Sequence, residues 1–485
     1  MNLHKNIIKF KKSKYINSTI YNGLIFTIFK YASYAIEIIT GIVISKMFGP
    51  KIFGIWGIYI IVMQYGQYLH LGTMFYADRE VPRLNVSQKY DQSLIVIRNV
   101  IVIYFFNIIV LAILSASILP FLSTSIHNLN NILTITGFLS VEFIKKLIYT
   151  WLRANKDLKK LAKALIINSA ITFVIIILTI NEYGILSILF ARICGMITVL
   201  ILVKSCIPVV LGIKTRKYKL LLRMIQHSIG LLLYNISFIV KTTVSRFVVI
   251  SYLSLTDIGY YSFAYFIYNA LLISLDGIYS IVFPKMMEQS EKNIDTTVYS
   301  SLLSDVGSVT LFNVSIVSIL VMQILIPLLL PEYIPALHPA TILVSSLGLS
   351  GAGFGQTIIL LSKYNEKIII WINGSIALLL SIMFVVLRKK GYSLTSIAYV
   401  EFCMNGLWAL IMKFMVLSRK GAGKDLILLV LRPFLKPLIG TAAILLYIEY
   451  IYQLNHDMLP FIIVSLFVAI SVSIKPMIRI LKHVK

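Results

Sequence analysis

Apolar residues run along this chain in stretches long enough to cross a lipid bilayer, and only short polar segments separate them. About 20 apolar residues in a helix span the ~30 Å hydrocarbon core of a membrane. The runs predict about fourteen transmembrane helices, an all-α membrane fold with almost no residues left for a soluble domain. The predicted spans are 21–46, 52–75, 94–119, 129–150, 161–180, 185–206, 229–253, 258–284, 306–330, 340–361, 368–387, 394–417, 426–448 and 459–480.

The composition agrees with this interpretation. Hydrophobic residues make up 58% of the chain and charged residues only 13%, against about 25% charged residues in soluble domains. The formal net charge is +26. Because the basic residues lie between apolar runs and not on one polar face, no nucleic-acid partner is expected.

The basic residues also predict the orientation. With a cytoplasmic N-terminus, the inside loops and adjoining helix ends hold roughly 34 of the 45 Lys and Arg residues and the outside loops about 5. This bias persists to the last residue, which supports the number of spans and predicts a cytoplasmic C-terminus. Arg388, Lys389 and Lys390 fall on the predicted outer side and depart from the pattern.

An internal repeat indicates two related halves. Residues 54–72, GIWGIYIIVMQYGQYLHLG, are matched in outline by residues 259–277, GYYSFAYFIYNALLISLDG, with the same spacing between the first and last glycines. The two segments are six spans apart, an offset that preserves orientation. Two parallel halves are a known transporter plan.

Three segments carry a family resemblance: KMFGPKIFGIWGIY after the first span, TDIGYYSFAYF after the seventh and PEYIPALHPATILVSS before the tenth. With them the chain resembles Wzx-type polysaccharide flippases of the multidrug/oligosaccharidyl-lipid/polysaccharide exporter superfamily. The resemblance implies two six-helix bundles, 1–210 and 211–418, around a central cavity, and an extra C-terminal helix pair, 419–485.

The same resemblance implies a function and partners. Such proteins move undecaprenyl-diphosphate-linked oligosaccharide repeat units across the bacterial cytoplasmic (inner) membrane for surface polysaccharides such as O-antigen. The expected partners are the lipid-linked oligosaccharide, membrane lipids, a polysaccharide polymerase and a chain-length regulator.

Charged residues inside the spans are the candidate site residues, because each costs ~2.5–3.5 kcal/mol at the bilayer centre and so faces protein or water. Lys30 in the first span, Arg192 in the sixth, and Lys241 and Arg246 in the seventh are predicted to bind the diphosphate of the substrate. The alternative is structural: Lys30 pairs with Glu37 two turns away, and Lys241 or Arg246 extends toward a membrane interface.

Three carboxylates, Glu37, Asp276 and Glu401, are predicted to couple transport to an ion, because a carboxylate shielded from water in a membrane cavity can take up a proton. Asp276 is equally explained as a helix cap or bend beside Gly277. A further charged group lies toward the cytoplasmic end of the fourth span and is either a substrate entrance or a solvated helix end. Its members are Glu142, Lys145, Lys146 and Arg153.

No catalytic residues, metal site or cofactor are expected. The GAGK sequence at 421–424 lacks the upstream glycine and the strand of a nucleotide-binding loop, so gradients or the substrate's own flux must drive transport. A cation-coupled multidrug exporter of the same superfamily remains an alternative, although the mid-membrane charges are mostly basic. A membrane glycan polymerase or ligase is a weaker one, because every predicted outer loop is short.

Overall fold

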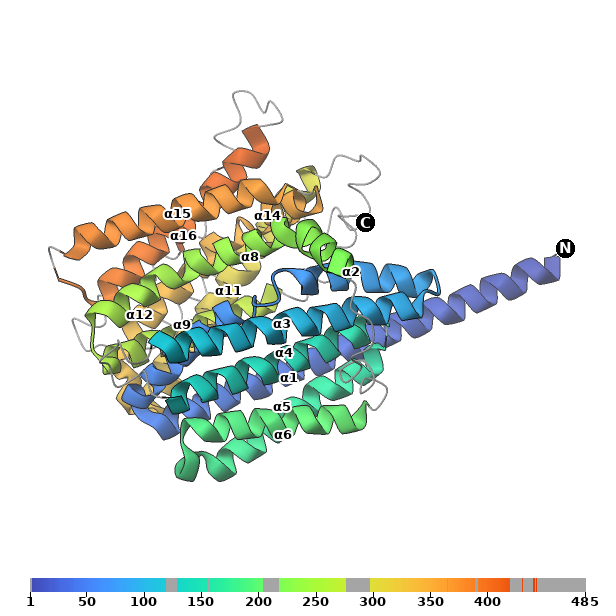
Figure 1. Ribbon diagram of the computed structural model, residues 1–485. Coiled ribbons are helices and arrows are strands. Elements are labelled where there is room, and N and C mark those ends of the chain that lie inside the picture. Colours follow the sequence, from blue (N-terminus) through green and yellow to red (C-terminus); the bar gives the residue numbers. More distant parts are fainter. Residues whose placement is uncertain are drawn as a thin grey trace. The chain divides into compact units, whose positions relative to one another are not determined.

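The computed structural model describes residues 2–118, 129–155, 157–203, 218–275, 297–363, 365–388 and 391–418, with a few isolated positions beyond. All regular secondary structure in these ranges is helical (Figure 1). The last two predicted spans, 426–448 and 459–480, lie outside the described residues, as does Asp276. The helices are α1 (Asn2–Gly66), α2 (Thr73–Val86), α3 (Tyr90–Ile118), α4 (Leu129–Ala154), α5 (Leu158–Tyr183), α6 (Ile185–Leu202), α8 (Tyr218–Tyr252), α9 (Leu255–Leu272), η3 (Ile273–Leu275), α11 (Thr297–Leu329), η4 (Pro331–Tyr333), α12 (Ile334–Ser345), α13 (Leu347–Gly351), α14 (Phe354–Ser362), α15 (Glu366–Arg388) and α16 (Leu394–Ser418).

The described part of the chain contains nine helical stretches that are long and apolar enough to cross a membrane. The first, Ile25–Gly66, holds two predicted spans, so the nine stretches account for ten of them. Of the other two predicted spans in this part, α4 carries four charged residues, and the run that begins in α9 continues beyond the described residues. The chain is a multi-pass membrane protein.

The first two predicted spans form one helix, α1, with a break at Gly49. The backbone of Gly49 has φ 63° and ψ 171°, and Pro50 follows. The positive φ suits glycine, and the proline favours an extended residue before it, so the Gly-Pro pair separates the two helical segments. The second segment ends at Gly66, and the charged residues beyond Gly72, predicted as a loop, form α2.

The chain divides into two compact units. Unit 1 comprises Met1–Met47 and Tyr59–Leu232, and unit 2 comprises Phe48–Ile58 and Leu233–Lys485. Phe48–Ile58 thus packs with unit 2 although its neighbours in sequence on both sides belong to unit 1. The third border along the chain, between Leu232 and Leu233, lies inside α8.

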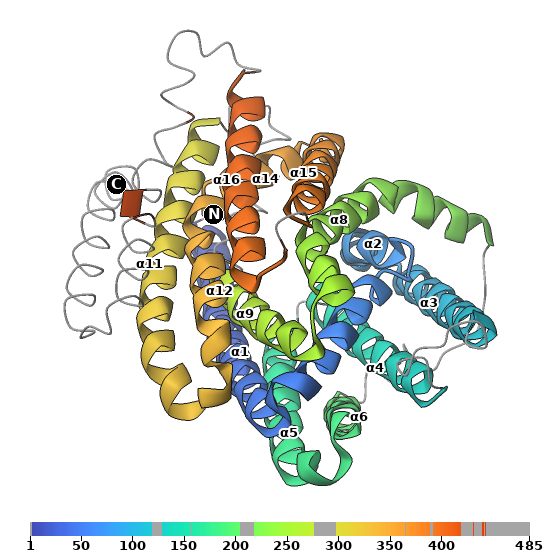
Figure 2. The same ribbon diagram turned by 90° about the vertical axis from the view of Figure 1, so that its left-hand side faces the viewer.

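Within unit 1, α5 and α6 lie side by side in both ribbon views, joined by a tight turn at Gly184 (Figures 1 and 2). A buried cluster joins α2, α3 and α4 and includes Met74, Val100, Tyr104 and Leu147. These contacts hold the polar side chains of α4, α5 and α6 in fixed positions.

Within unit 2, α12 packs against both α11 and α16 (Figure 2). The tenth predicted span, 340–361, is not a single helix: it is divided into α12, α13 and α14. Its small residues still allow close packing, because a Cβ on Gly351 would meet the backbone of Gly307 and Ser308. The breaks in the helix and the close approach of its backbone to a neighbouring helix therefore occur in the same segment.

The first glycines of the internal repeat meet inside unit 2. A Cβ added to Gly259 would meet the carbonyl oxygen of Pro50, and one on Gly54 would meet that of Leu255. Phe53, only 2% exposed, packs edge-on against Phe263 and Tyr333. Gly54 and Gly259 let the two helical segments approach closely, and the ring of Phe53 packs beside them. Together these contacts attach Phe48–Ile58 to unit 2.

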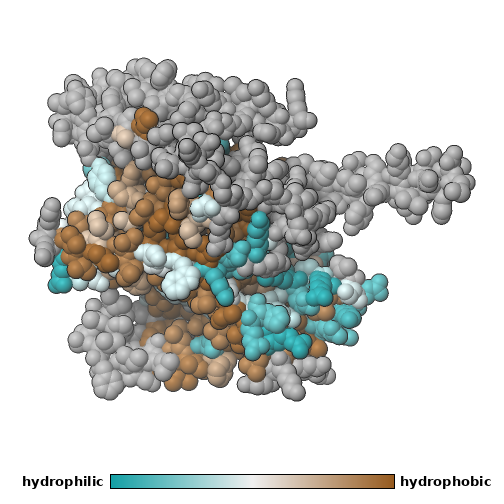
Figure 3. All heavy atoms as spheres, turned by 90° about the horizontal axis from the view of Figure 1, so that it is seen from above, coloured by the Kyte–Doolittle hydropathy of each residue, from teal (hydrophilic) through white to brown (hydrophobic). Residues whose placement is uncertain are grey.

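The surface suits a lipid environment. Apolar residues cover much of the described surface in Figure 3. The side chains of Trp371, Leu178 and Leu328 are 77%, 71% and 71% exposed. The discordant Arg388 of the outer basic cluster lies over the ring of Tyr252, 5.1 Å from its centroid, a cation–π contact that accounts for its position.

Candidate functional site

A buried carboxylate, Glu401 on α16, forms the centre of a polar cluster in unit 2. Its side chain is 4% exposed. Ser245 donates a hydrogen bond of 2.7 Å to Glu401 Oε2, the Tyr261 hydroxyl donates one of 2.9 Å to the same atom, and the Tyr265 hydroxyl donates to Oε1. Three hydroxyl groups thus satisfy a carboxylate that would otherwise be costly to bury.

Lys241 on α8 is the second charged member of this cluster. Its side chain is 6% exposed, its Nζ donates a 3.4 Å hydrogen bond to Asn405 Oδ1, and the same Nζ lies 4.3 Å from the centroid of the Trp408 ring. In the described part of the chain Lys241 forms no ion pair. An amide oxygen and an aromatic face therefore surround a cation that has no carboxylate partner.

Arg246, also 6% exposed, completes the group that we call the Glu401 cluster: Lys241, Ser245, Arg246, Tyr261, Tyr265, Glu401, Asn405 and Trp408. Its guanidinium carbon lies 4.6 Å from the centroid of the Tyr265 ring, the ring whose hydroxyl binds Glu401. Two cations and one carboxylate give the cluster a net positive charge.

Helix periodicity explains how the chain builds this cluster. Lys241 and Ser245 are one turn apart on α8, and Tyr261 and Tyr265 are one turn apart on α9. On α16, Glu401, Asn405 and Trp408 follow the spacing i, i+4, i+7 that places residues on one face of a helix. Ser254 and Asp257 form a capping box that fixes the start of α9.

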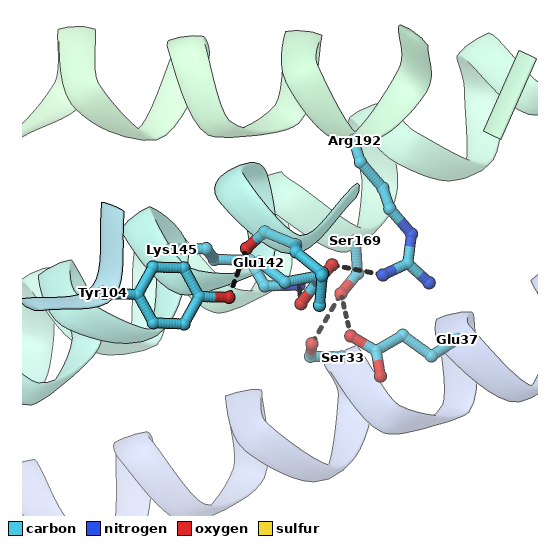
Figure 4. Close-up of polar contacts among 8 residues, drawn as sticks. Ser33, Glu37, Tyr104, Glu142, Lys145, Ser169 and Arg192 are labelled. Atoms are coloured by element: carbon cyan, nitrogen blue, oxygen red, sulfur yellow. Dashed lines mark hydrogen bonds and ion pairs between the residues drawn. The ribbon is translucent and has the colours of Figure 1, made fainter. Parts of the chain in front are cut away.

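Unit 1 contains a different arrangement around Glu142 on α4 (Figure 4). Lys145 Nζ lies 2.7 Å from Glu142 Oε2, and Arg192 Nη1 on α6 pairs with Glu142 Oε1. The side chains of Glu142 and Arg192 are each 29% exposed. Two cations therefore neutralise this carboxylate, and we call Glu142, Lys145 and Arg192 the Glu142 cluster.

A chain of hydroxyl groups lies beside the Glu142 cluster in Figure 4. The hydroxyl oxygens of Ser33 on α1 and Ser169 on α5 are 2.7 Å apart, and Ser169 donates to Glu37 Oε1 at 3.2 Å. Lys30 lies instead over the ring of Tyr34, 5.5 Å from its centroid. The hydrogen-bond partner of Glu37 is thus Ser169, and no ion pair joins it to Lys30 in the described residues.

The structure therefore brings Lys241, Arg246 and Glu401 together in unit 2, and in unit 1 it pairs Arg192 with Glu142 and Glu37 with Ser169. Lys30 lies on α1 two turns from Glu37 and outside both clusters. Sequence reasoning missed the partners: three hydroxyl donors to Glu401, and Asn405 and Trp408 beside Lys241. The sequence pattern that could have identified these partners is polar or aromatic residues one turn apart on an apolar helix. Ordinary helix packing produces the same pattern.

Comparison with solved structures defines the class of fold: the chain has the fold of MOP-superfamily transporters. An inward-facing multidrug resistance transporter of the MATE family in this superfamily matches with a TM-score of 0.64 at 12% identity, over 80% of this chain and 95% of its own. The lipid II flippase MurJ in an inward closed conformation matches with a TM-score of 0.64 at 16% identity, over 93% of this chain and 98% of its own.

A MOP-superfamily transporter from Pyrococcus furiosus, whose binding pocket is described as reversed in polarity, matches with a TM-score of 0.57 at 11% identity, over 83% of this chain and 96% of its own. No protein-family model and no curated protein sequence matches the chain. At such identities the likeness concerns the fold alone.

Proposed function

We propose that this protein is a flippase that moves undecaprenyl-diphosphate-linked oligosaccharide repeat units across the bacterial cytoplasmic membrane. The observation that supports it is Lys241: a buried lysine that forms no ion pair among the described residues, on a helix that also carries the buried Arg246. Phosphate oxygens are strong acceptors for both cations. A lipid-linked diphosphate supplies the direct ion pair that the described residues around Lys241 do not.

The proposed mechanism is alternating access. A positive cavity opens first to the cytoplasm and then to the outside, while the polyprenyl tail stays in lipid. Lys241 and Arg246 are the proposed ligands of the diphosphate, and Lys30 and Arg192 are the other candidates. Glu401, with its hydroxyl donors, is the proposed ion-coupling carboxylate, with Glu37 and Asp276 as the other candidates.

A second candidate function is export of cationic drugs. The observation in its favour is Glu401 itself, because a buried carboxylate is a natural counter-charge for a cationic compound. The neighbouring Lys241 and Arg246 argue against it, since they would repel such a compound from the same cluster.

A reconstituted transport assay separates the two functions. The full chain is placed in lipid vesicles, and inward movement is followed for a fluorescent polyprenyl-diphosphate N-acetylglucosamine and, separately, for ethidium. We expect the diphosphate lipid to move at least tenfold faster than in protein-free vesicles, and ethidium not to move faster. Transport of ethidium without the diphosphate lipid would establish the exporter and refute the flippase.

A further inference from the structure

Helix α4 carries a further cation in unit 1, Lys146, that is not part of the Glu142 cluster. Lys146 follows Lys145 directly, yet it forms no ion pair in the described part of the chain. The carboxylates that interact electrostatically with Lys146 are Asp78 and Glu142. Arg153 pairs with Asp78 at 2.6 Å, while Lys145 and Arg192 pair with Glu142. The four cations exceed the two carboxylates, so the group has a net charge of +2.

An aromatic ring lies next to Lys146, and a buried imidazole lies next to that ring. Its Nζ lies 5.9 Å from the centroid of the Tyr68 ring, and that ring lies 5.9 Å from the imidazole of His70. His70 is fully buried. Its Nδ1 accepts a 3.0 Å hydrogen bond from the backbone N–H of Gly72, which leaves the ring proton on Nε2. Among the described residues Nε2 has no hydrogen-bond acceptor, an exception that calls for a physical reason.

The backbone around His70 is held firmly in an unusual conformation. Leu71 has φ 49°, a left-handed value that a leucine rarely adopts, and Gly72 has φ 82°. Asn107 donates a 2.6 Å hydrogen bond to the carbonyl of Leu69, and Thr73 donates one of 2.6 Å to that of His70. Surrounding contacts therefore maintain a strained segment beside an excess positive charge, which is typical of binding sites.

We infer that Lys146, with the Tyr68 ring beside it and the imidazole of His70 beside that ring, forms a second anion-binding site, one that receives the diphosphate group of the transported lipid in unit 1. This inference rests on the proposed function, because only that function supplies a lipid-linked diphosphate. The ammonium group provides the charge, and the imidazole N–H provides a directional donor. In the predicted topology α4 runs toward the cytoplasm at this point, so the substrate meets this site from the side on which it is made.

Amine labelling of the unmodified protein tests the site directly. The full chain in phosphatidylcholine nanodiscs is acetylated with and without farnesyl diphosphate, and the labelling rates of Lys146 and of the exposed Lys163 on α5 are measured by mass spectrometry. We expect farnesyl diphosphate to slow labelling of Lys146 about tenfold and to leave Lys163 unchanged, and farnesol to protect neither. Equal labelling of Lys146 with and without farnesyl diphosphate would overturn the inference.

Further conditions in the labelling experiment identify the source of the anion. Protection of Lys146 by phosphatidylglycerol in the nanodisc, with no further effect of farnesyl diphosphate, would assign the site to ordinary membrane lipid and refute the inference. Protection by inorganic pyrophosphate alone, as strong as by farnesyl diphosphate, would assign it to a free anion and refute it equally.

Calorimetry on charge variants completes the design. Lys146→Gln is expected to weaken farnesyl diphosphate binding about tenfold, Lys146→Arg to retain it, and Lys163→Gln to leave it unchanged. Should Lys146→Gln fail to fold, the labelling result on the unmodified chain decides. Weak binding by Lys241→Gln with normal binding by Lys146→Gln would refute this inference alone, whereas no binding by the unmodified chain would refute the proposed function as well.

Discussion

The two units satisfy their central carboxylates in different ways. In unit 1, Glu142 is partly exposed and two cations, Lys145 and Arg192, neutralise it. In unit 2, Glu401 is buried and hydroxyl groups satisfy it, and Lys241 forms no ion pair with the carboxylates of the described residues. Unit 1 thus holds its carboxylate by ion pairs, whereas unit 2 holds its carboxylate by hydroxyl groups and buries a lysine beside it.

The difference matters because of where the charges lie. A partly exposed ion pair is screened by water and contributes little to stability. A buried cation next to an amide and an aromatic ring keeps most of its electrostatic strength, and its burial is costly unless a partner arrives. Changing single members of each cluster therefore tests whether the two units really differ in this way.

The largest effect is expected for Lys241→Gln, which removes the buried charge while keeping a polar side chain that is one atom shorter. In a strain that depends on this protein, surface glycan should fall to the level of the deletion, with the protein still present in the membrane by immunoblot. Lys367→Gln, which removes an exposed lysine on α15, is the matched control and should leave export normal. Normal surface glycan with Lys241→Gln would show that the buried charge is not used.

Glu401→Gln should come next. The amide keeps one acceptor oxygen but turns the other position into a donor, which conflicts with the hydroxyl groups of Ser245 and Tyr261. We expect a loss of about 3 kcal/mol in the free energy of unfolding, within the range for hydrogen bonds to charged groups, measured by thermal unfolding in detergent. A change below about 0.5 kcal/mol would mean that Glu401 is held in its protonated form.

Two tyrosines compare the units with the same deletion of one hydroxyl group. Tyr261→Phe removes a 2.9 Å bond to a carboxylate in unit 2 and should cost about 2 kcal/mol. Tyr104→Phe removes a 3.0 Å bond to the carbonyl of Leu139 in unit 1 and should cost about 1 kcal/mol. Equal costs in chemical unfolding would argue that Glu401 carries no charge.

The smallest effect is expected for Glu142→Gln in unit 1. Since the ion pairs are partly exposed, the loss of stability should be about 0.5–1 kcal/mol. Arg192→Gln in the same background should recover part of it, because the second change removes a positive charge that Glu142 no longer balances. A cost above about 3 kcal/mol would show that the Glu142 cluster is as strongly shielded from water as the Glu401 cluster.

Hydropathy predicted the helices well because lipid requires long continuous apolar segments. The helix break at Gly49–Pro50 could be predicted from the residue types alone. The helix α2 was not predicted, since its charged residues look like those of a loop. The division of the tenth predicted span into α12, α13 and α14 depends on how helices pack around its glycines, which the sequence alone does not show.

The candidate site could be predicted only in part. Lys241, Arg246 and Glu401 stand out because charge in an apolar helix is costly. Their partners Tyr261 and Tyr265 do not, because the role of a tyrosine depends on how its helix is rotated against its neighbours. The functions assigned to all the candidate residues stay predictions: Lys30, Arg192, Lys241, Arg246, Glu37, Asp276 and Glu401.

The placement of Phe48–Ile58 bears on how the protein is made. These residues leave the ribosome early, but the surfaces that hold them, around Gly259, Phe263 and Tyr333, are synthesised about 200 residues later or more. Until then Phe53 has no protein partner among those rings. Separate expression of the two halves of the gene would therefore yield a second half that lacks a segment of its own core, and chimaeras between relatives should carry this segment together with the later half.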